Sequence, residues 1–225
     1  AQRMPSAEPS FRNLLLNQRV ELFAPFVSRS VWASCAGDPG EPTGRVWAGL
    51  DLSSTTDLTS LVLVWQDDEA RWCVRPYFWT PERGLQDRAR RDKQPYDVWV
   101  DQGHMLTTPG ASINYDHVAH FLCGLEVEWA GLAFDRWRID QFRAALARVG
   151  APDDLVEAFQ EFGQGYQSMA PALDALEKEL VEGRLAHGGH PVLTMCAANA
   201  VVETDPAGNR KLTKAKSNGR IDGMV

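Results

Sequence analysis

The chain has 225 residues, a formal net charge of −7 at pH 7 and a hydrophobic content of 44%. This length suits one domain with a substantial core and a small appendage. The negative charge argues against a protein that coats nucleic acid through charge alone. No apolar stretch approaches the ~18 residues of a membrane span, and the N-terminus lacks the pattern of a signal peptide, so no membrane partner is predicted.

The four cysteines are widely spaced and mostly lie among apolar neighbours: Cys35, Cys73, Cys123 and Cys196. No Cys-x-x-Cys pair occurs. This pattern is typical of reduced, buried thiols in a cytosolic protein and disfavours a zinc site.

The first part of the chain differs in composition from the rest. Residues 1–44 combine a candidate short helix, Phe11 to Gln18, with a turn-rich stretch at 37–44, and we interpret them as a connecting arm. The main domain is predicted at 45–225. It opens with apolar runs at 46–52, 58–65 and 71–79. Because the runs are separated by only a few residues, they predict an antiparallel three-strand meander.

After the meander the pattern changes to alternating helices and strands. We expect a helix or loop at 82–93, a helical turn at 95–100 and a short strand within 104–110. An amphipathic helix should carry Tyr115, Val118, Leu122, Leu125 and Trp129 on one face. A strand ending at Asp135 and a helix over 139–149 follow, then a strand at 155–162, helices at 173–180 and 191–202, and a hairpin at 204–213. This order predicts an α/β fold, with a mixed sheet of the meander plus parallel strands flanked by helices.

Three aspartates stand in apolar surroundings far apart in the sequence. Asp51 and Asp135 each end a short apolar run, and Asp222 lies in an apolar setting near the C-terminus. A carboxylate in such a place is costly to bury unless it has a partner, and a divalent metal ion is a common one. The pattern predicts that the three converge as a cation site. Asp57 is a candidate fourth ligand, although a turn role is the simpler interpretation.

Basic residues near these acids are candidate contacts for a nucleic-acid backbone. Arg136 and Arg138 follow Asp135, and Lys214 and Lys216 belong to a basic strip at 209–220 that contains no acid. The alternatives are pairing with acids for the arginines and a solvated loop for the strip. The tryptophans and phenylalanines fall mainly in strand and helix patterns, so we interpret them as core.

Two histidine pairs offer a competing zinc site. His117 and His120 are three apart on a predicted helix, and His187 and His190 bracket two glycines. Their separate contexts favour surface histidines or histidines with ordinary hydrogen bonds.

Several stretches, taken in order, resemble one known family. They are 49–59 around Asp51, 134–138 around Asp135, 162–172, 190–200, 208–214 and 220–223 around Asp222. Together they resemble the nuclease domain of tailed-bacteriophage large terminase subunits, in the group with an HK97-like terminase. The resemblance covers the chain from about residue 11 to its end.

This resemblance carries its own expectations. It implies a ribonuclease H-like fold whose three acidic positions match Asp51, Asp135 and Asp222. It implies an endonuclease that cleaves double-stranded DNA, the phage concatemer, during genome packaging in the host cytoplasm. Two Mg²⁺ or Mn²⁺ ions would serve phosphodiester hydrolysis, with Asp51 as the bridging ligand.

The resemblance also concerns the larger assembly. Partners would be double-stranded DNA, the portal protein and the small terminase subunit, and the isolated domain would be a monomer. The chain contains no Gly-x-x-x-x-Gly-Lys-Ser/Thr phosphate loop. Residues 1–44 would then be a linker from an ATPase domain that is missing here.

Three rival functions remain open at this point. Residues 49–56 superficially resemble the first phosphate loop of actin-like and sugar-kinase phosphotransferases, but a second glycine-rich loop is lacking. A junction resolvase or transposase would share the fold and cut branched DNA. A non-catalytic docking module of the packaging motor would carry the acids without using them.

Overall fold

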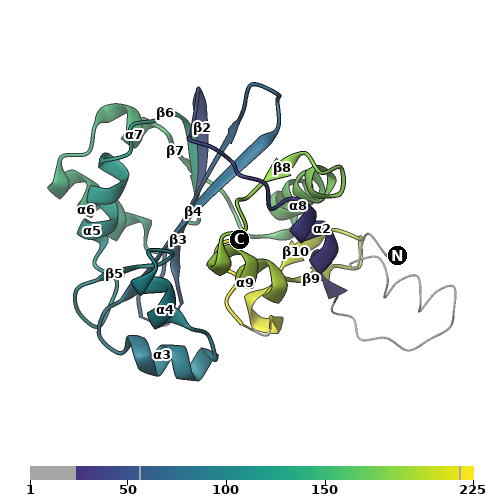
Figure 1. The fold of residues 1–225 in the computed structure, drawn as a ribbon. Coiled ribbons are helices and arrows are strands. Elements are labelled where there is room, and N and C mark those ends of the chain that lie inside the picture. The colour runs from purple at the N-terminus through teal and green to yellow at the C-terminus, as the bar shows by residue number, and fades with distance from the viewer. Residues whose placement is uncertain (1–23, 56, 218) are drawn as a thin grey trace, which may run out of the picture. The chain divides into compact units, whose positions relative to one another are not determined.

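The computed structural model describes residues 24–55, 57–217 and 219–225, which form two compact units (Figure 1). One unit is continuous, residues 39–163, and the other joins residues 24–38 to 164–225. The candidate helix Phe11 to Gln18 and the arm up to residue 23 lie outside the described residues. The proposed boundary between a linker and a nuclease domain at residues 44 and 45 stays a prediction.

The continuous unit is built on a mixed sheet with strand order β5-β4-β3-β2-β6-β7 (Figure 1). The strands are β2 (Arg45–Asp51), β3 (Thr59–Gln66), β4 (Trp72–Pro81), β5 (Leu106–Thr108), β6 (Glu128–Phe134) and β7 (Phe159–Glu161). The first three pair antiparallel, whereas β6 runs parallel to β2 and β7 parallel to β6. The predicted meander, followed by parallel strands, is therefore confirmed.

The central strands of the sheet bury apolar side chains on one shared face. In β3 the side chains of Leu61, Leu63 and Trp65 are fully buried. β2 alternates in the same way, with Val46, Ala48 and Leu50 buried, which is the period-2 pattern of a strand with one core face. Because successive side chains of a strand point to opposite faces, Asp51 at the end of β2 belongs to the face opposite Leu50.

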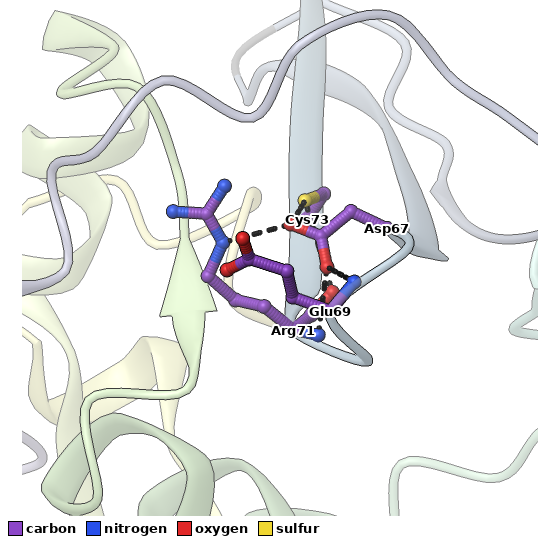
Figure 2. Close-up of polar contacts among 4 residues, drawn as sticks. All are labelled: Asp67, Glu69, Arg71 and Cys73. Atoms are coloured by element: carbon purple, nitrogen blue, oxygen red, sulfur yellow. Dashed lines mark hydrogen bonds and ion pairs between the residues drawn. The ribbon is translucent and has the colours of Figure 1, made fainter.

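The turn between β3 and β4 is organised by one carboxylate (Figure 2). Asp67 Oδ1 accepts hydrogen bonds from the backbone N–H of Glu69 at 3.0 Å and of Arg71 at 2.9 Å. Its Oδ2 accepts from Arg71 Nε at 3.0 Å, and the Cys73 thiol lies 3.8 Å from the same oxygen. Hydrogen bonding by Arg71 lowers the pKa of Asp67. The carboxylate thus fixes the register of the longest hairpin of the sheet.

Helices α5 (Tyr115–Cys123) and α6 (Ile139–Val149) lie side by side on one face of this sheet (Figure 1). Phe121 of α5 meets Tyr77 and Trp79 of β4 edge to face, at centroid distances of 4.6 and 5.1 Å. Phe142 of α6 is fully buried and packs against Phe159 of β7. The unit also contains α3 (Leu85–Asp92), α4 (Tyr96–Asp101) and α7 (Asp153–Glu157).

Two sequence predictions about this unit were wrong in extent. The helix expected to carry Leu125 and Trp129 ends at Cys123, and Trp129 belongs to β6. Gly124 caps that helix. Beyond it, apolar residues up to Trp129 of β6 continue the helical spacing by chance. The strand expected at 155–162 begins as helix α7, because Pro152 and two acids favour a helix start there, and only β7 is extended.

The second unit packs helices on a small antiparallel sheet with strand order β1-β9-β10. Its strands are β1 (Ala24–Pro25), β9 (Val201–Thr204) and β10 (Arg210–Leu212), with β8 (Leu185–Ala186) separate from that sheet. Its helices are α2 (Arg29–Ser34), α8 (Tyr166–Val181), α9 (Pro191–Asn199) and the short 3-10 helix η2 (Lys214–Lys216).

Most elements of this unit agree with the sequence predictions. The helix over 173–180 and the hairpin over 204–213 are confirmed, and Gly183 follows α8 with the positive φ of +67° that such a helix end favours. The helix expected to reach Val202 ends at Asn199, because the chain turns extended into β9. In the described parts of the chain, no helix has both the length and the apolar character needed to cross a membrane.

Candidate active site

Two of the predicted acids lie at the same edge of the sheet. Asp51 is the last residue of β2, and Asp135 directly follows β6. These strands are parallel neighbours whose register pairs Leu50 with Phe134, so each aspartate comes one position after a paired residue. Neighbouring strands lie about 4.8 Å apart, which brings the two backbones together at the carboxyl edge. This edge is where ligands bind in open α/β sheets.

The loop after Asp51 is held by hydrogen bonds from several directions. Ser53 N–H donates to Thr59 Oγ1 at 3.0 Å, and Ser53 Oγ donates to the Asp57 carbonyl at 2.8 Å. The Tyr115 hydroxyl donates to the Ser53 carbonyl at 2.6 Å. Asp51 itself is only 8% exposed. The serine and threonine run therefore fixes the direction in which the chain leaves the acid, and Asp57 lies within this loop.

The segment after Asp135 presents charge and an aromatic ring. Arg136 pairs with Glu161 of β7 at 3.0 Å, and both side chains are exposed. Trp137 is 53% exposed, and the Arg138 guanidinium lies over its ring at 4.3 Å from the centroid. Both arginines thus follow the acid on the loop that leads into α6.

Arg138 is itself unusual in two respects. Its backbone has a φ of +62°, a left-handed conformation that is costly for a residue with a Cβ. Its Nε atom is buried and has no hydrogen-bond partner among the described residues. Burial raises the pKa of Tyr115, and the positive charge of Arg138 partly offsets that rise. Backbone strain and an unsatisfied donor of this kind cluster at functional sites.

The third predicted acid belongs to the other unit. Asp222 is 2% exposed, and its Oδ1 pairs with Lys214 Nζ at 2.7 Å. Lys216 pairs with Glu203 of β9 at 2.6 Å. Both lysines of the basic strip that we expected to contact DNA thus make ion pairs with carboxylates. Their role in DNA binding stays a prediction, as does the meeting of Asp222 with the other two acids.

The acids suit a hard divalent cation by their chemistry. Carboxylate oxygens are the ligands that Mg²⁺ and Mn²⁺ prefer, and Mg²⁺ keeps several waters, so few protein ligands suffice. Within neither unit do the described residues gather three or more His, Cys, Asp or Glu side chains in a group that could hold a metal ion. Asp51 and Asp135 thus stay predicted metal ligands, placed next to each other by the pairing of β2 with β6.

The second histidine pair that offered a rival zinc site, His187 and His190, makes hydrogen bonds with the backbone. His187 Nδ1 accepts from the Gly189 N–H at 3.1 Å, and its Nε2 lies 2.9 Å from the Trp32 carbonyl. His190 caps α9 by accepting from the Leu193 N–H at 3.4 Å. These contacts occupy the Nδ1 atoms of both residues in backbone hydrogen bonds.

Sequence reasoning missed the exposed aromatic residues and the tyrosine of the site. Trp137, Trp47 and Phe162 are exposed, contrary to the interpretation of the aromatic residues as core. For Trp137 a signal existed, because it stands between two arginines directly after the strand has ended. No local signal connected Tyr115 to the loop at Ser53, since the two are 62 residues apart.

Comparisons with known proteins give one consistent match. The sequence matches the family described as terminase large subunit, endonuclease domain, over residues 10–225. It is 52% identical to the terminase large subunit of Enterobacteria phage HK97, over 100% of this chain and 44% of that protein. It is 27% identical to protein YmfN of Escherichia coli strain K12, over 78% of this chain and 40% of that protein.

Solved structures give the same picture. The crystal structure of the HK97 large terminase matches with a TM-score of 0.84 at 51% identity, over 99% of this chain and 46% of that one. The large terminase nuclease from thermophilic phage G20c matches with a TM-score of 0.52 at 12% identity, over 86% and 91%, which shows a shared fold. The predicted ribonuclease H-like fold class is confirmed. The chain spans less than half the length of the curated relatives that it matches.

Proposed function

The chain belongs to the family of terminase large subunit endonuclease domains, and from this premise we propose that it is a metal-dependent endonuclease that cleaves double-stranded DNA. The observation that carries the proposal is the placement of Asp51 and Asp135 at the carboxyl ends of adjacent parallel strands. Two carboxylates at one sheet edge can hold a divalent cation next to a phosphate.

In this proposal each residue of the site has its own role. Asp51, at the end of the strand between β3 and β6, would be the ligand shared by two Mg²⁺ or Mn²⁺ ions, and Asp135 and Asp222 would each hold one of them. The ions, when bound, neutralise charge on the scissile phosphate and lower the pKa of water. Tyr115 and Ser53 orient the loop beside Asp51 through their 2.6 Å hydrogen bond. Asp57 is a further candidate ligand from that loop.

In this proposal, affinity for DNA comes from contacts between arginine side chains and the phosphate backbone of the DNA. Arg136 and Arg138 stand directly after Asp135, so a phosphate bound at the acids would lie within their reach. The pair of Arg136 with Glu161 is exposed, and such pairs contribute little stability, so the guanidinium can exchange its carboxylate for a phosphate. These contacts carry no sequence information, and we expect cutting with little sequence preference.

The activity of a whole terminase is part of the proposal. The relative with 52% identity is more than twice as long as this chain, and the chain itself has no phosphate-loop motif. We propose that an ATPase domain precedes it in the full protein, with residues 1–44 as linker. The full protein would cut the phage concatemer in the host cytoplasm together with a portal protein and a small terminase subunit.

Plasmid digestion tests the proposed activity. We expect supercoiled plasmid to be nicked and linearised with Mn²⁺ or Mg²⁺, and to stay intact with Ca²⁺ or EDTA. Asp51→Asn and Asp135→Asn should each lower the cutting rate by at least about a hundredfold, because each removes a charged metal ligand. Asp154→Asn, an exposed acid on α7, is the matched control and should cut normally.

The rival functions correspond to distinct results of this experiment. Cutting confined to branched DNA would indicate a junction resolvase or transposase. Intact plasmid under every metal condition, with the chain folded, would indicate a docking module. Full cutting by Asp51→Asn would contradict the assigned site.

A further inference from the structure

The buried carboxylate of Asp222 has a lysine as its direct counter-ion. Lys214 Nζ lies 2.7 Å from Asp222 Oδ1, with the aspartate 2% and the lysine side chain 39% exposed. Burying a carboxylate is costly unless a positive charge compensates it. Lys214 therefore does for Asp222, in the chain alone, what a metal ion would do on binding.

The backbones on both sides of this pair are anchored independently of it. The segment that carries Lys214 is attached to β9, because Thr213 N–H donates to the Val201 carbonyl at 3.1 Å. The segment that carries Asp222 is attached to α9, because Asn199 Nδ2 donates to the Arg220 carbonyl at 3.2 Å. The ion pair is made through the flexible lysine stem, and neither of these two backbone anchors has to change when Lys214 Nζ leaves Asp222.

We propose that Lys214 is a built-in competitor of the divalent cation at Asp222: it holds the carboxylate before metal binds and is expelled when metal binds. This inference rests on the proposed function, which makes Asp222 a metal ligand. A divalent ion on the carboxylate repels the ammonium group, and the half-exposed side chain can move into water at little cost. Lys214 is thus a positioning residue that sets how tightly the metal binds.

A second cation stays near the acid when Lys214 leaves. Arg220 precedes Asp222 by two residues on the anchored segment. A variant without Lys214 therefore keeps a positive charge beside the buried acid.

The structure offers a closely matched control. Lys216 lies on the same turn η2 and pairs with Glu203 at 2.6 Å, with a side-chain exposure of 37%. Lys214→Met and Lys216→Met remove the same charge from the same short helix. Only the first should change how a metal ion competes for Asp222.

The experiment measures Mn²⁺ affinity by titration calorimetry in the 225-residue chain without DNA. We expect Lys214→Met to bind Mn²⁺ about fivefold more tightly than the wild type, which corresponds to roughly 1 kcal/mol for the ion pair that no longer competes. Lys216→Met should bind like the wild type. Equal or weaker binding by Lys214→Met than by Lys216→Met would overturn the inference.

A measurement on the wild type keeps the test decisive if Lys214→Met does not fold. Amine acylation followed by mass spectrometry reports how reactive each lysine is. Saturating Mg²⁺ should raise the acylation of Lys214, because the released amine is no longer ion-paired, and leave Lys216 unchanged. Unchanged acylation of Lys214 in the metal-loaded chain would contradict expulsion.

Failure of the proposed function would look different. In that case the wild type would bind no Mn²⁺, or Asp222→Asn would bind it as tightly as the wild type. If the wild type binds Mn²⁺, Asp222→Asn weakens binding and Lys214→Met does not tighten it, then Asp222 is a ligand and only the competition is refuted.

Discussion

The loop from Asp135 to Arg138 concentrates features that stability alone would not select. Arg138 combines a left-handed backbone with a buried Nε that lacks a partner among the described residues, and it stacks on the exposed Trp137. Strain of this kind persists where the surrounding structure enforces it, commonly at binding sites. We propose that this loop is the part of the site that binds the phosphate backbone of the DNA.

Two arginine substitutions test this binding of the DNA backbone. Replacing both Arg136 and Arg138 with Ala should weaken double-stranded DNA binding and reduce the slope of log K against log salt by about 2, because each phosphate contact releases counterions. Fluorescence anisotropy in Ca²⁺ over a range of salt concentrations measures this.

Arg148→Ala supplies the control for that measurement. Arg148 pairs with Asp116 near the far end of α6, away from Asp135, so its loss should leave the slope unchanged. Equal effects of the two changes would mean that the loop carries no specific phosphate contact.

His187 makes the other unit sensitive to acid. Burial lowers the pKa of His187, whose ring stacks on Trp32 at 4.0 Å. Because the Gly189 N–H donates to Nδ1, the neutral ring carries its proton on Nε2. The unfolded chain therefore takes up a proton near pH 6.5, whereas the folded chain resists it to a lower pH, so stability falls as the pH drops below about 6.5.

Thermal unfolding at pH 7.5 and 5.5 measures this sensitivity. We expect the wild type to lose more stability between the two values than His187→Phe, which keeps an aromatic ring but cannot titrate. His117→Gln, at an exposed histidine, should behave like the wild type. An equal loss in His187→Phe would show that other groups cause the acid sensitivity.

At the scale of elements, both well-defined hairpins use an aspartate at the start of the turn. Asp67 accepts two backbone N–H bonds between β3 and β4, and Asp205 accepts from Ala207 and Asn209 between β9 and β10. Such turns pre-set strand register through local hydrogen bonds. They explain why the sequence located these hairpins well.

The hairpin of β3 and β4 matters more for the candidate site, because β3 pairs with β2, the strand that ends at Asp51. Asp67→Ala should lower the thermal midpoint, because two backbone donors and Arg71 lose their acceptor (Figure 2). Asp68→Ala, one residue further on in an exposed position, should leave the midpoint nearly unchanged. Equal midpoints for the two variants would show that the turn forms without the carboxylate.

Structural features with a local pattern in the sequence could be predicted, whereas features without one could not. The strands before Asp51 and Asp135 could be predicted because a short apolar run with an acid at its end is a local pattern. The extent of α5 could not, because apolar residues of β6 happened to continue the helical spacing beyond Gly124. The pairing of Lys214 with Asp222 was equally hidden, since the basic strip offers several lysines and arginines and no rule selects one.

At the scale of the whole molecule, the chain leaves one unit after residue 38, forms the second unit, and returns to the first at residue 164. Residues 24–38 and 164–225 form one compact unit, and the intervening residues 39–163 form the other. No composition shift marks the return at residue 164, so sequence reasoning treated 45–225 as continuous. Of the three predicted acids, Asp51 and Asp135 lie in one unit and Asp222 lies in the other.

We propose above all that Asp51 and Asp135 hold a divalent metal ion at the carboxyl edge of the sheet. Anomalous diffraction from a crystal soaked in Mn²⁺ tests it most directly. We expect a strong peak within coordination distance of both carboxylates, and we expect Asp51→Asn to lose it. Mn²⁺ peaks only at other acids, with none at these two aspartates, would contradict it.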